Sequence, residues 1–152
     1  MNRRGWSMVV GLLSLLMAGV FAVSCVAPQA EVRQVELQRL TWETLDIGLL
    51  LNLHNPNDIE MPLDQVDWNL NLFESAMARG VVRPQARIPA KGREQVRVPI
   101  SVAITELVGA AEALVRSDRI PWDVGGTCHF GTAAGPITVD FSRSGTWTNP
   151  LR

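Results

Sequence analysis

The amino-acid sequence predicts a mostly β domain: an immunoglobulin- or fibronectin-like antiparallel β-sandwich of six to seven strands with one amphipathic helix. Apolar and polar residues alternate with a period of two in several segments, which is typical of strands that bury one face. Clusters of turn-forming residues separate these segments. One segment has a helical period instead. Such a set of elements over about 115 residues fits a small sandwich.

The alternation is clearest in Leu45–His54, where Ile47, Leu49, Leu51 and Leu53 share one face. Pro99 falls inside another alternating segment, which predicts an edge or bulged strand because proline cannot donate a ladder hydrogen bond. The pair Gly125-Gly126 predicts a bulge or a close backbone approach. The other expected strands are Gln65–Phe73, Glu94–Ala103 and Ile137–Ser142, with the less regular Val32–Trp42 and Ile120–Phe130.

The expected helix covers Thr105–Asp118. Its apolar residues lie at offsets that place them on one helical face. Thr105 is a suitable N-cap, and Arg116 lies favourably near the other end. The apolar residues are Leu107, Val108, Ala111, Leu114 and Val115.

The N-terminal residues predict a targeting segment. Arg3 and Arg4 precede an apolar run over residues 8–23, which is the pattern of a secretory signal and is short for a membrane-spanning helix. The run ends in Ser24-Cys25 and resembles a bacterial lipobox, although Ala22 stands where leucine is usual. The resemblance implies cleavage between Ser24 and Cys25 and lipidation of Cys25. An ordinary signal peptide or an uncleaved anchor remains the alternative.

This interpretation divides the chain into a signal peptide (1–24), a lipidated cysteine with a short tether (25–31) and a folded domain (32–149). In bacterial lipoproteins the residue after the lipidated cysteine influences sorting, and an aspartate there resembles an inner-membrane retention signal. Val26 stands at that position here, so we expect the protein to lie at the periplasmic face of a bacterial outer membrane. Loss of Arg3 and Arg4 changes the net charge from −1 to −3. With Cys25 acylated, Cys128 has no partner for an intramolecular disulfide.

The order of the predicted elements resembles the late embryogenesis abundant type 2 family, which carries the WHy (water stress and hypersensitive response) domain. The resemblance rests on an alternating strand that runs into an Asn-Pro-Asn turn (LDIGLLLNLHNPND), followed by VDWNLNLF, ESAMARG, VRVPISVAI, one helix and a closing SGTW. It covers residues 32–148 and implies an Ig-like sandwich without catalytic residues, linked to desiccation and other stress.

The turn itself, Asn55-Pro56-Asn57, is predicted to be structural. Pro56 fixes its own φ and keeps Asn55 extended. Asn57 tolerates a positive φ and is expected to adopt a conformation that is costly for branched residues.

Five arginines form a loose basic stretch that could contact anionic lipid or an acidic partner, or could be an ordinary wet sheet face. They are Arg79, Arg83, Arg87, Arg93 and Arg97.

The sequence lacks the usual signatures of catalysis, of metal sites and of nucleic-acid binding. No nucleophile elbow, phosphate loop or dinucleotide fingerprint is present, so we expect no enzyme, cofactor or small-molecule substrate. Cys128 and His129 are adjacent and should point to opposite faces of a strand, so only one can join His54. The acidic residues Asp58, Glu60, Asp64 and Asp67 match no cation-binding loop and suggest a solvated rim.

Among the tryptophans, Trp68 and Trp122 should lie in the core, whereas Trp42 and Trp147 lie near element ends and could mark a binding surface. Two hypotheses follow. The first is a membrane-tethered domain that protects envelope proteins or the membrane during water stress. The second is an interaction module that docks a specific partner in envelope assembly or transport.

Overall fold

The computed structural model describes residues 25–152. The predicted signal peptide, residues 1–24, lies outside the described residues, so its cleavage stays a prediction. Within the described part, no helix is long and apolar enough to cross a membrane.

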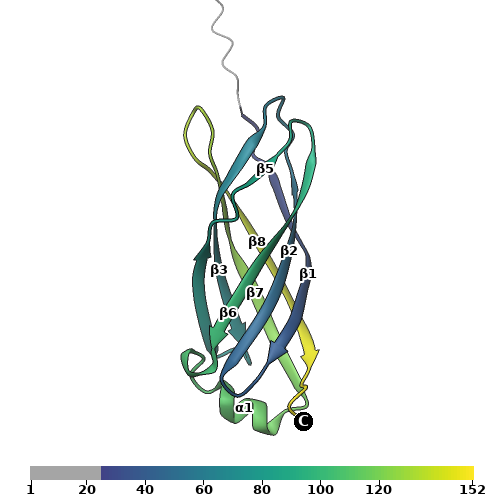
Figure 1. Cartoon of the computed structure of the whole chain (residues 1–152), viewed down its shortest axis with the longest axis vertical. Coiled ribbons are helices and arrows are strands. Elements are labelled where there is room, and N and C mark those ends of the chain that lie inside the picture. Colours follow the sequence, from purple (N-terminus) through teal and green to yellow (C-terminus); the bar gives the residue numbers. More distant parts are fainter. Residues whose placement is uncertain (1–24) are drawn as a thin grey trace, which may run out of the picture.

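Within residues 25–152, eight strands form two antiparallel sheets, which confirms the mostly β sandwich (Figure 1). The first sheet has the order β1-β2-β6. The second has the order β4-β3-β7-β8, with β5 also paired to β3. The strands are β1 (Gln29–Leu40), β2 (Thr44–His54), β3 (Met61–Leu72), β4 (Ala76–Val82), β5 (Ala86–Ile88), β6 (Arg93–Ala103), β7 (Arg119–Phe130) and β8 (Ile137–Thr148). The alternation predicted six or seven strands, because the three residues of β5 are too few to show a period.

The core lies between the two sheets and follows the predicted alternation. The inner-face residues Ile47, Leu49 and Leu51 of β2 are fully buried, and so are Val66 and Leu70 of β3. Trp68 and Trp122 are also buried, as predicted, at 9% and 8% exposure. Burial of one face per strand is the main stabilising contribution in such a sandwich.

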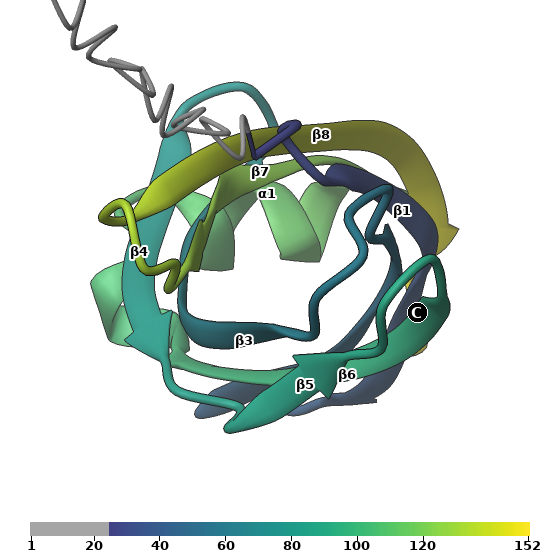
Figure 2. The same ribbon diagram turned by 90° about the horizontal axis from the view of Figure 1, so that it is seen from above.

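The two sheets meet differently at their two sides. At the β1/β8 side, the Arg143 guanidinium donates hydrogen bonds to the carbonyls of Val32 and Arg33, at 2.8 and 2.6 Å. The Trp147 indole donates to the Val35 carbonyl at 3.3 Å. At the other side β6 pairs only with β2, so it is an edge strand, as Pro99 predicted. Figure 2 shows β5 and β6 next to each other on that side.

The predicted helix is shorter than expected and is divided in two. A 3₁₀ turn (Ile104–Glu106) is followed by α1 (Ala110–Arg116), because Gly109 adopts φ +84° and serves as the N-cap in place of Thr105. Leu107 and Leu114 are buried, but Val108 and Val115 are 81% and 58% exposed, so the predicted apolar face was partly wrong. The helix closes the end of the sandwich where the C-terminus lies (Figure 1).

Gly125-Gly126 forms no bulge, because the register with β3 and with β8 runs through both residues without a shift. The predicted close approach is confirmed at Gly126, where an ideal Cβ would lie 1.9 Å from the Asp67 carbonyl oxygen. This glycine therefore allows β3 and β7 to pack together.

Candidate functional site

The Asn-Pro-Asn turn lies at the end of the sandwich opposite α1, where the chain enters the described domain (Figure 1). We call this end the tip. It consists of residues 25–28, the β2–β3 turn (55–60), the β5–β6 turn (89–92) and the β7–β8 loop (131–136).

Asn55 is fully buried, and its hydrogen bonds connect two of the turns at the tip. Its backbone N–H donates to the Gly92 carbonyl at 2.9 Å, and its side-chain amide donates to the Ile59 carbonyl at 2.7 Å. The same amide nitrogen lies 3.3 Å from the Ile88 carbonyl and 3.2 Å from that of Pro89. Asn55 therefore binds the β2–β3 turn to the start of the β5–β6 turn.

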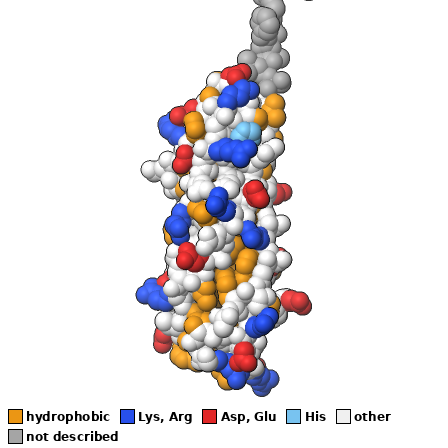
Figure 3. All heavy atoms as spheres, turned by 90° about the vertical axis from the view of Figure 1, so that its right-hand side faces the viewer, with side chains coloured by type: hydrophobic (Ala, Val, Ile, Leu, Met, Phe, Trp, Pro, Cys, Tyr) orange, Lys and Arg blue, Asp and Glu red, His pale blue; other side chains and the backbone are white. Residues whose placement is uncertain are grey.

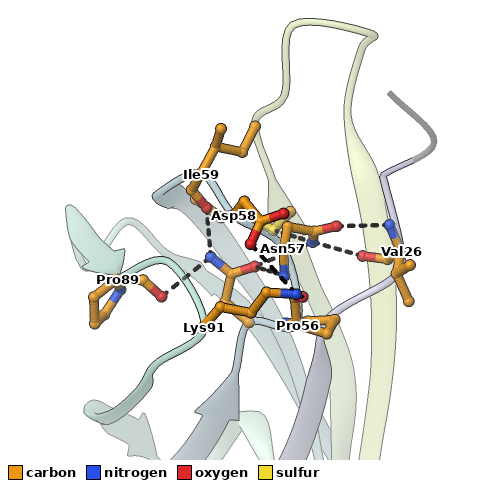
Figure 4. Close-up of polar contacts among 9 residues, drawn as sticks. Val26, Pro56, Asn57, Asp58, Ile59, Pro89 and Lys91 are labelled. Atoms are coloured by element: carbon orange, nitrogen blue, oxygen red, sulfur yellow. Dashed lines mark hydrogen bonds and ion pairs between the residues drawn. The ribbon is translucent and has the colours of Figure 1, made fainter. Parts of the chain in front are cut away.

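Asn57 extends this network to the N-terminal segment. Its Oδ1 accepts the Val26 backbone N–H at 2.8 Å, and its Nδ2 donates to the Val26 carbonyl at 2.8 Å (Figure 4). We call this pair of hydrogen bonds the Asn57 clamp. The Asn57 backbone N–H and its Nδ2 also donate to Oδ1 of Asn55, at 3.0 and 3.1 Å.

The structural role predicted for this turn therefore has another physical basis. Asn57 does not have a positive φ. The described residues other than glycine that do are Phe73, Glu74, Gln85 and Lys91. The prediction of backbone strain at Asn57 was wrong. Asn57 instead uses its buried amide, which supplies both a donor and an acceptor to the distant backbone of Val26.

The predicted tether over residues 25–31 is shorter in the structure. Val26 is held by the clamp, Pro28 is buried, and β1 begins at Gln29. Cys25 is half-buried and packs against the core. The proposed lipidation residue thus lies directly on the folded tip.

Of the five predicted arginines, the structure brings Arg83, Arg87 and Arg97 around one groove of about 630 Å³ between the β4–β5 segment and β6. Each has a polar neighbour: Gln65 Oε1 at 3.1 Å, Glu60 at 2.9 Å and Glu36 at 3.6 Å, respectively. We call this feature the arginine groove. Arg79 lies over the outer face of β3 and β4, and Arg93 lies near His54, so neither lines it.

The residues considered as metal ligands or nucleophiles are dispersed. Cys128 points into the core, whereas His129 lies on the outer face with Nε2 2.7 Å from Asp67 Oδ2, so the two face opposite ways, as predicted. Burial, with a smaller contribution from Asp140, raises the pKa of Cys128 to about 12. Hydrogen bonds from Gln65 and then His129 lower the pKa of Asp67. The described residues contain no group of three potential metal ligands.

The acidic residues near the turn also separate. Asp58 pairs with Lys91 at 3.5 Å, and Glu60 pairs with Arg87 at 2.9 Å.

Charges of both signs are interspersed on the face at the right of Figure 1, and hydrophobic side chains gather over its lower half (Figure 3). Trp147 stacks on Trp122, with ring centroids 5.1 Å apart, whereas Trp42 is 51% exposed.

These features define an elongated antiparallel sandwich that is closed by a short helix at one end and by asparagine-linked turns at the other. The chain belongs to the late embryogenesis abundant type 2 family, because the profile of the late embryogenesis abundant proteins matches residues 50–145. Members of such families are generally non-enzymatic, and membership supports a role in water stress.

The chain is also similar to one sequence relative and, in its fold, to two solved structures. The chain is 24% identical over 124 residues to the late embryogenesis abundant protein Lea14-A of Gossypium hirsutum, covering 82% of this chain and 76% of that protein. The solution structure of a protein from Arabidopsis thaliana has a TM-score of 0.68 at 15% identity, covering 82% and 83% of the two chains. A crystal structure from Archaeoglobus fulgidus has a TM-score of 0.60 at 11% identity, covering 85% of this chain and all of that one.

Proposed function

We propose that the protein is a non-enzymatic, lipid-anchored late embryogenesis abundant type 2 domain that protects envelope proteins or the membrane itself during water loss. The family match over residues 50–145 carries this proposal. The position of Cys25 at the edge of the folded domain, after a signal-like segment, supports the anchor.

In this proposal, cleavage between Ser24 and Cys25 leaves Cys25 as the first residue, and acyl chains on it hold the protein in the membrane. Each buried CH₂ contributes roughly 0.8 kcal/mol, so two or more chains give stable attachment. The location that we propose is the periplasmic face of a bacterial outer membrane.

Metabolic labelling tests the anchor. The full chain is expressed in a Gram-negative host that is fed an alkyne fatty acid, beside Cys25→Ser and the matched control Cys128→Ser. We expect label on the natural chain and on the control, and none on Cys25→Ser. Unchanged labelling of Cys25→Ser would disprove lipidation at this residue.

Survival after drying tests the protective role. A strain that lacks the protein should survive desiccation less well, and the full chain should restore survival. We expect Cys25→Ser to restore it poorly, because this variant is neither acylated nor cleaved at this site and so lacks the proposed lipid anchor. Normal survival of the deletion strain would contradict a protective role.

The arginine groove favours a second candidate function, the docking of an acidic partner in envelope assembly or transport. Arg87 and Arg97 keep 69% and 56% of their side chains exposed despite their ion pairs, so they remain accessible to a ligand. The combined change of Arg83, Arg87 and Arg97 to Gln tests it. The control changes Arg33, Arg116 and Arg119, which are exposed and do not line this groove.

Under the docking hypothesis, the groove variant remains folded and anchored but loses an assembly phenotype, and the control variant does not. The docking hypothesis would be rejected if the deletion strain has no assembly phenotype and both variants survive desiccation normally. The protective role would then explain the results better.

A further inference from the structure

We propose that the tip of the sandwich is a membrane-contacting face, and that the Asn57 clamp holds the domain end-on against a lipid bilayer. The inference rests on the proposed anchoring through Cys25. It adds the surface that meets the lipid and the residue that fixes the orientation of the domain.

The first argument is the length of free chain between anchor and fold. Five freely extended residues, 26–30, would have allowed roughly 20 Å of travel. The structure removes this freedom at the first of them, because both backbone polar groups of Val26 are bound by Asn57. Consecutive Cα atoms lie about 3.8 Å apart, so a lipid on Cys25 begins within one residue of the fixed backbone.

The second argument is the rigidity of the structure that carries the clamp. Asn57 is 9% exposed, and Asn55 supports it from the fully buried side. The Lys91 backbone N–H donates to the Asn57 carbonyl at 2.8 Å, and its Nζ donates to the Pro56 carbonyl at 2.7 Å (Figure 4). The β2–β3 and β5–β6 turns are thus joined, and an anchor that is fixed to one is fixed to both.

The third argument is the surface that surrounds the anchor. Val26 and Ile59 are 58% and 48% exposed, although both are apolar. The β7–β8 loop, residues 131–136, carries no charged residue, and the carboxylates of Asp58 and Glu60 are paired with Lys91 and Arg87, respectively. Apolar side chains beside a lipid anchor gain free energy by entering the interfacial layer of a bilayer. This composition suits a lipid surface.

The two ends of the domain allow a direct measurement of its orientation. Ile59 lies at the tip, and Val108, 81% exposed, lies beside α1 at the far end. Lipidation blocks Cys25 and Cys128 is fully buried, so one introduced cysteine takes the label. The lipidated full chain carrying Ile59→Cys or Val108→Cys is labelled with a fluorophore and reconstituted into phosphatidylethanolamine–phosphatidylglycerol vesicles that contain a headgroup quencher.

We expect quenching to be about threefold or more stronger at position 59 than at position 108, because end-on contact places only the tip at the interface. Asn57→Ala should reduce this ratio towards one, whereas Asn69→Ala, an asparagine on the outer face of β3, should leave it unchanged. A second variant inserts about ten Gly and Ser residues between Cys25 and Val26, which adds roughly 30 Å of reach outside the folded body. In this variant too, the ratio of quenching at position 59 to quenching at position 108 should fall towards one, while the melting temperature stays the same.

Flotation with the vesicles is measured in the same samples and reports the anchor separately. Equal quenching at both positions in protein that floats would overturn the end-on orientation while leaving the anchor intact. An unchanged ratio after the insertion would overturn the role of the clamp. If the natural chain does not float at all, the proposed anchoring is wrong and this inference falls with it.

Discussion

Asn57 binds both backbone polar groups of Val26, a residue 31 positions earlier in the chain, with two hydrogen bonds of 2.8 Å each. An asparagine amide can do this because its carbonyl and amino groups reproduce the acceptor and donor of a peptide bond. The segment that leads into β1 is therefore fixed to the β2–β3 turn, which joins the two sheets.

The clamp predicts the effect of removing the Asn57 amide. Asn57→Ala removes a largely buried side-chain amide together with its hydrogen bonds to Val26 and Asn55, so the free energy of unfolding should fall by about 1–3 kcal/mol. Asn71→Ala, on the half-exposed outer face of β3, should change it by less than about 0.5 kcal/mol. Urea denaturation followed by tryptophan fluorescence measures both. Equal stability of Asn57→Ala and the natural chain would show that the clamp contributes nothing.

Gly126 predicts a second stability effect. The ideal Cβ of an alanine there would lie 1.9 Å from the Asp67 carbonyl oxygen, so β3 and β7 must separate to accept it. Gly126→Ala should lower the free energy of unfolding by about 2–3 kcal/mol. Gly125→Ala is the matched control, because its nearest atom is the movable Oδ1 of Asn69 at 3.0 Å. A control that is as destabilised as Gly126→Ala would contradict the steric explanation.

The sequence predicted the strands well because their alternation is a local signal. Ile47 and its neighbours are buried on the predicted face, and Pro99 lies in an edge strand as expected. The helix was placed correctly but drawn too long. Apolar spacing did not reveal that Gly109 would adopt a positive φ and start the helix later.

The candidate site was less predictable, because its contacts join residues that are distant in the chain. The Asn-Pro-Asn turn was recognised, but local turn chemistry suggested backbone strain at Asn57. The partner that explains this residue is Val26, in a segment interpreted as a tether. Likewise, grouping Arg83, Arg87 and Arg97 without Arg79 and Arg93 required the strand topology.

Asp67 predicts how stability depends on pH. Its pKa is lowered by hydrogen bonds from Gln65 and then from His129, so the folded state favours the ionised carboxylate. That stabilisation is fully present above the pKa of the unfolded chain, about 3.9, and is lost as the pH falls through the lower folded value. Asp67→Asn should therefore melt at a lower temperature than the natural chain at pH 6, and the difference should shrink below about pH 4.

The control for this pH profile is Asp123→Asn. Asp123 is exposed on the outer face of β7, between the buried Trp122 and Val124. Its melting-temperature difference should stay small at every pH. A difference for Asp67→Asn that is constant down to pH 3 would contradict the proposed linkage.

Cys128 predicts a thiol that does not react in the folded protein. Its side chain is fully buried on the core face of β7, and burial raises its pKa to about 12. The thiolate is the reactive species, so neither access nor ionisation favours modification at pH 8. In the Cys25→Ser variant, which leaves Cys128 as the remaining thiol, a maleimide should label almost none of the native protein and all of it in denaturant. The same reagent should label Ile59→Cys in that background within minutes, because position 59 is exposed at the tip. Rapid labelling of Cys128 under native conditions would mean that β7 opens far more often than its position in the core implies.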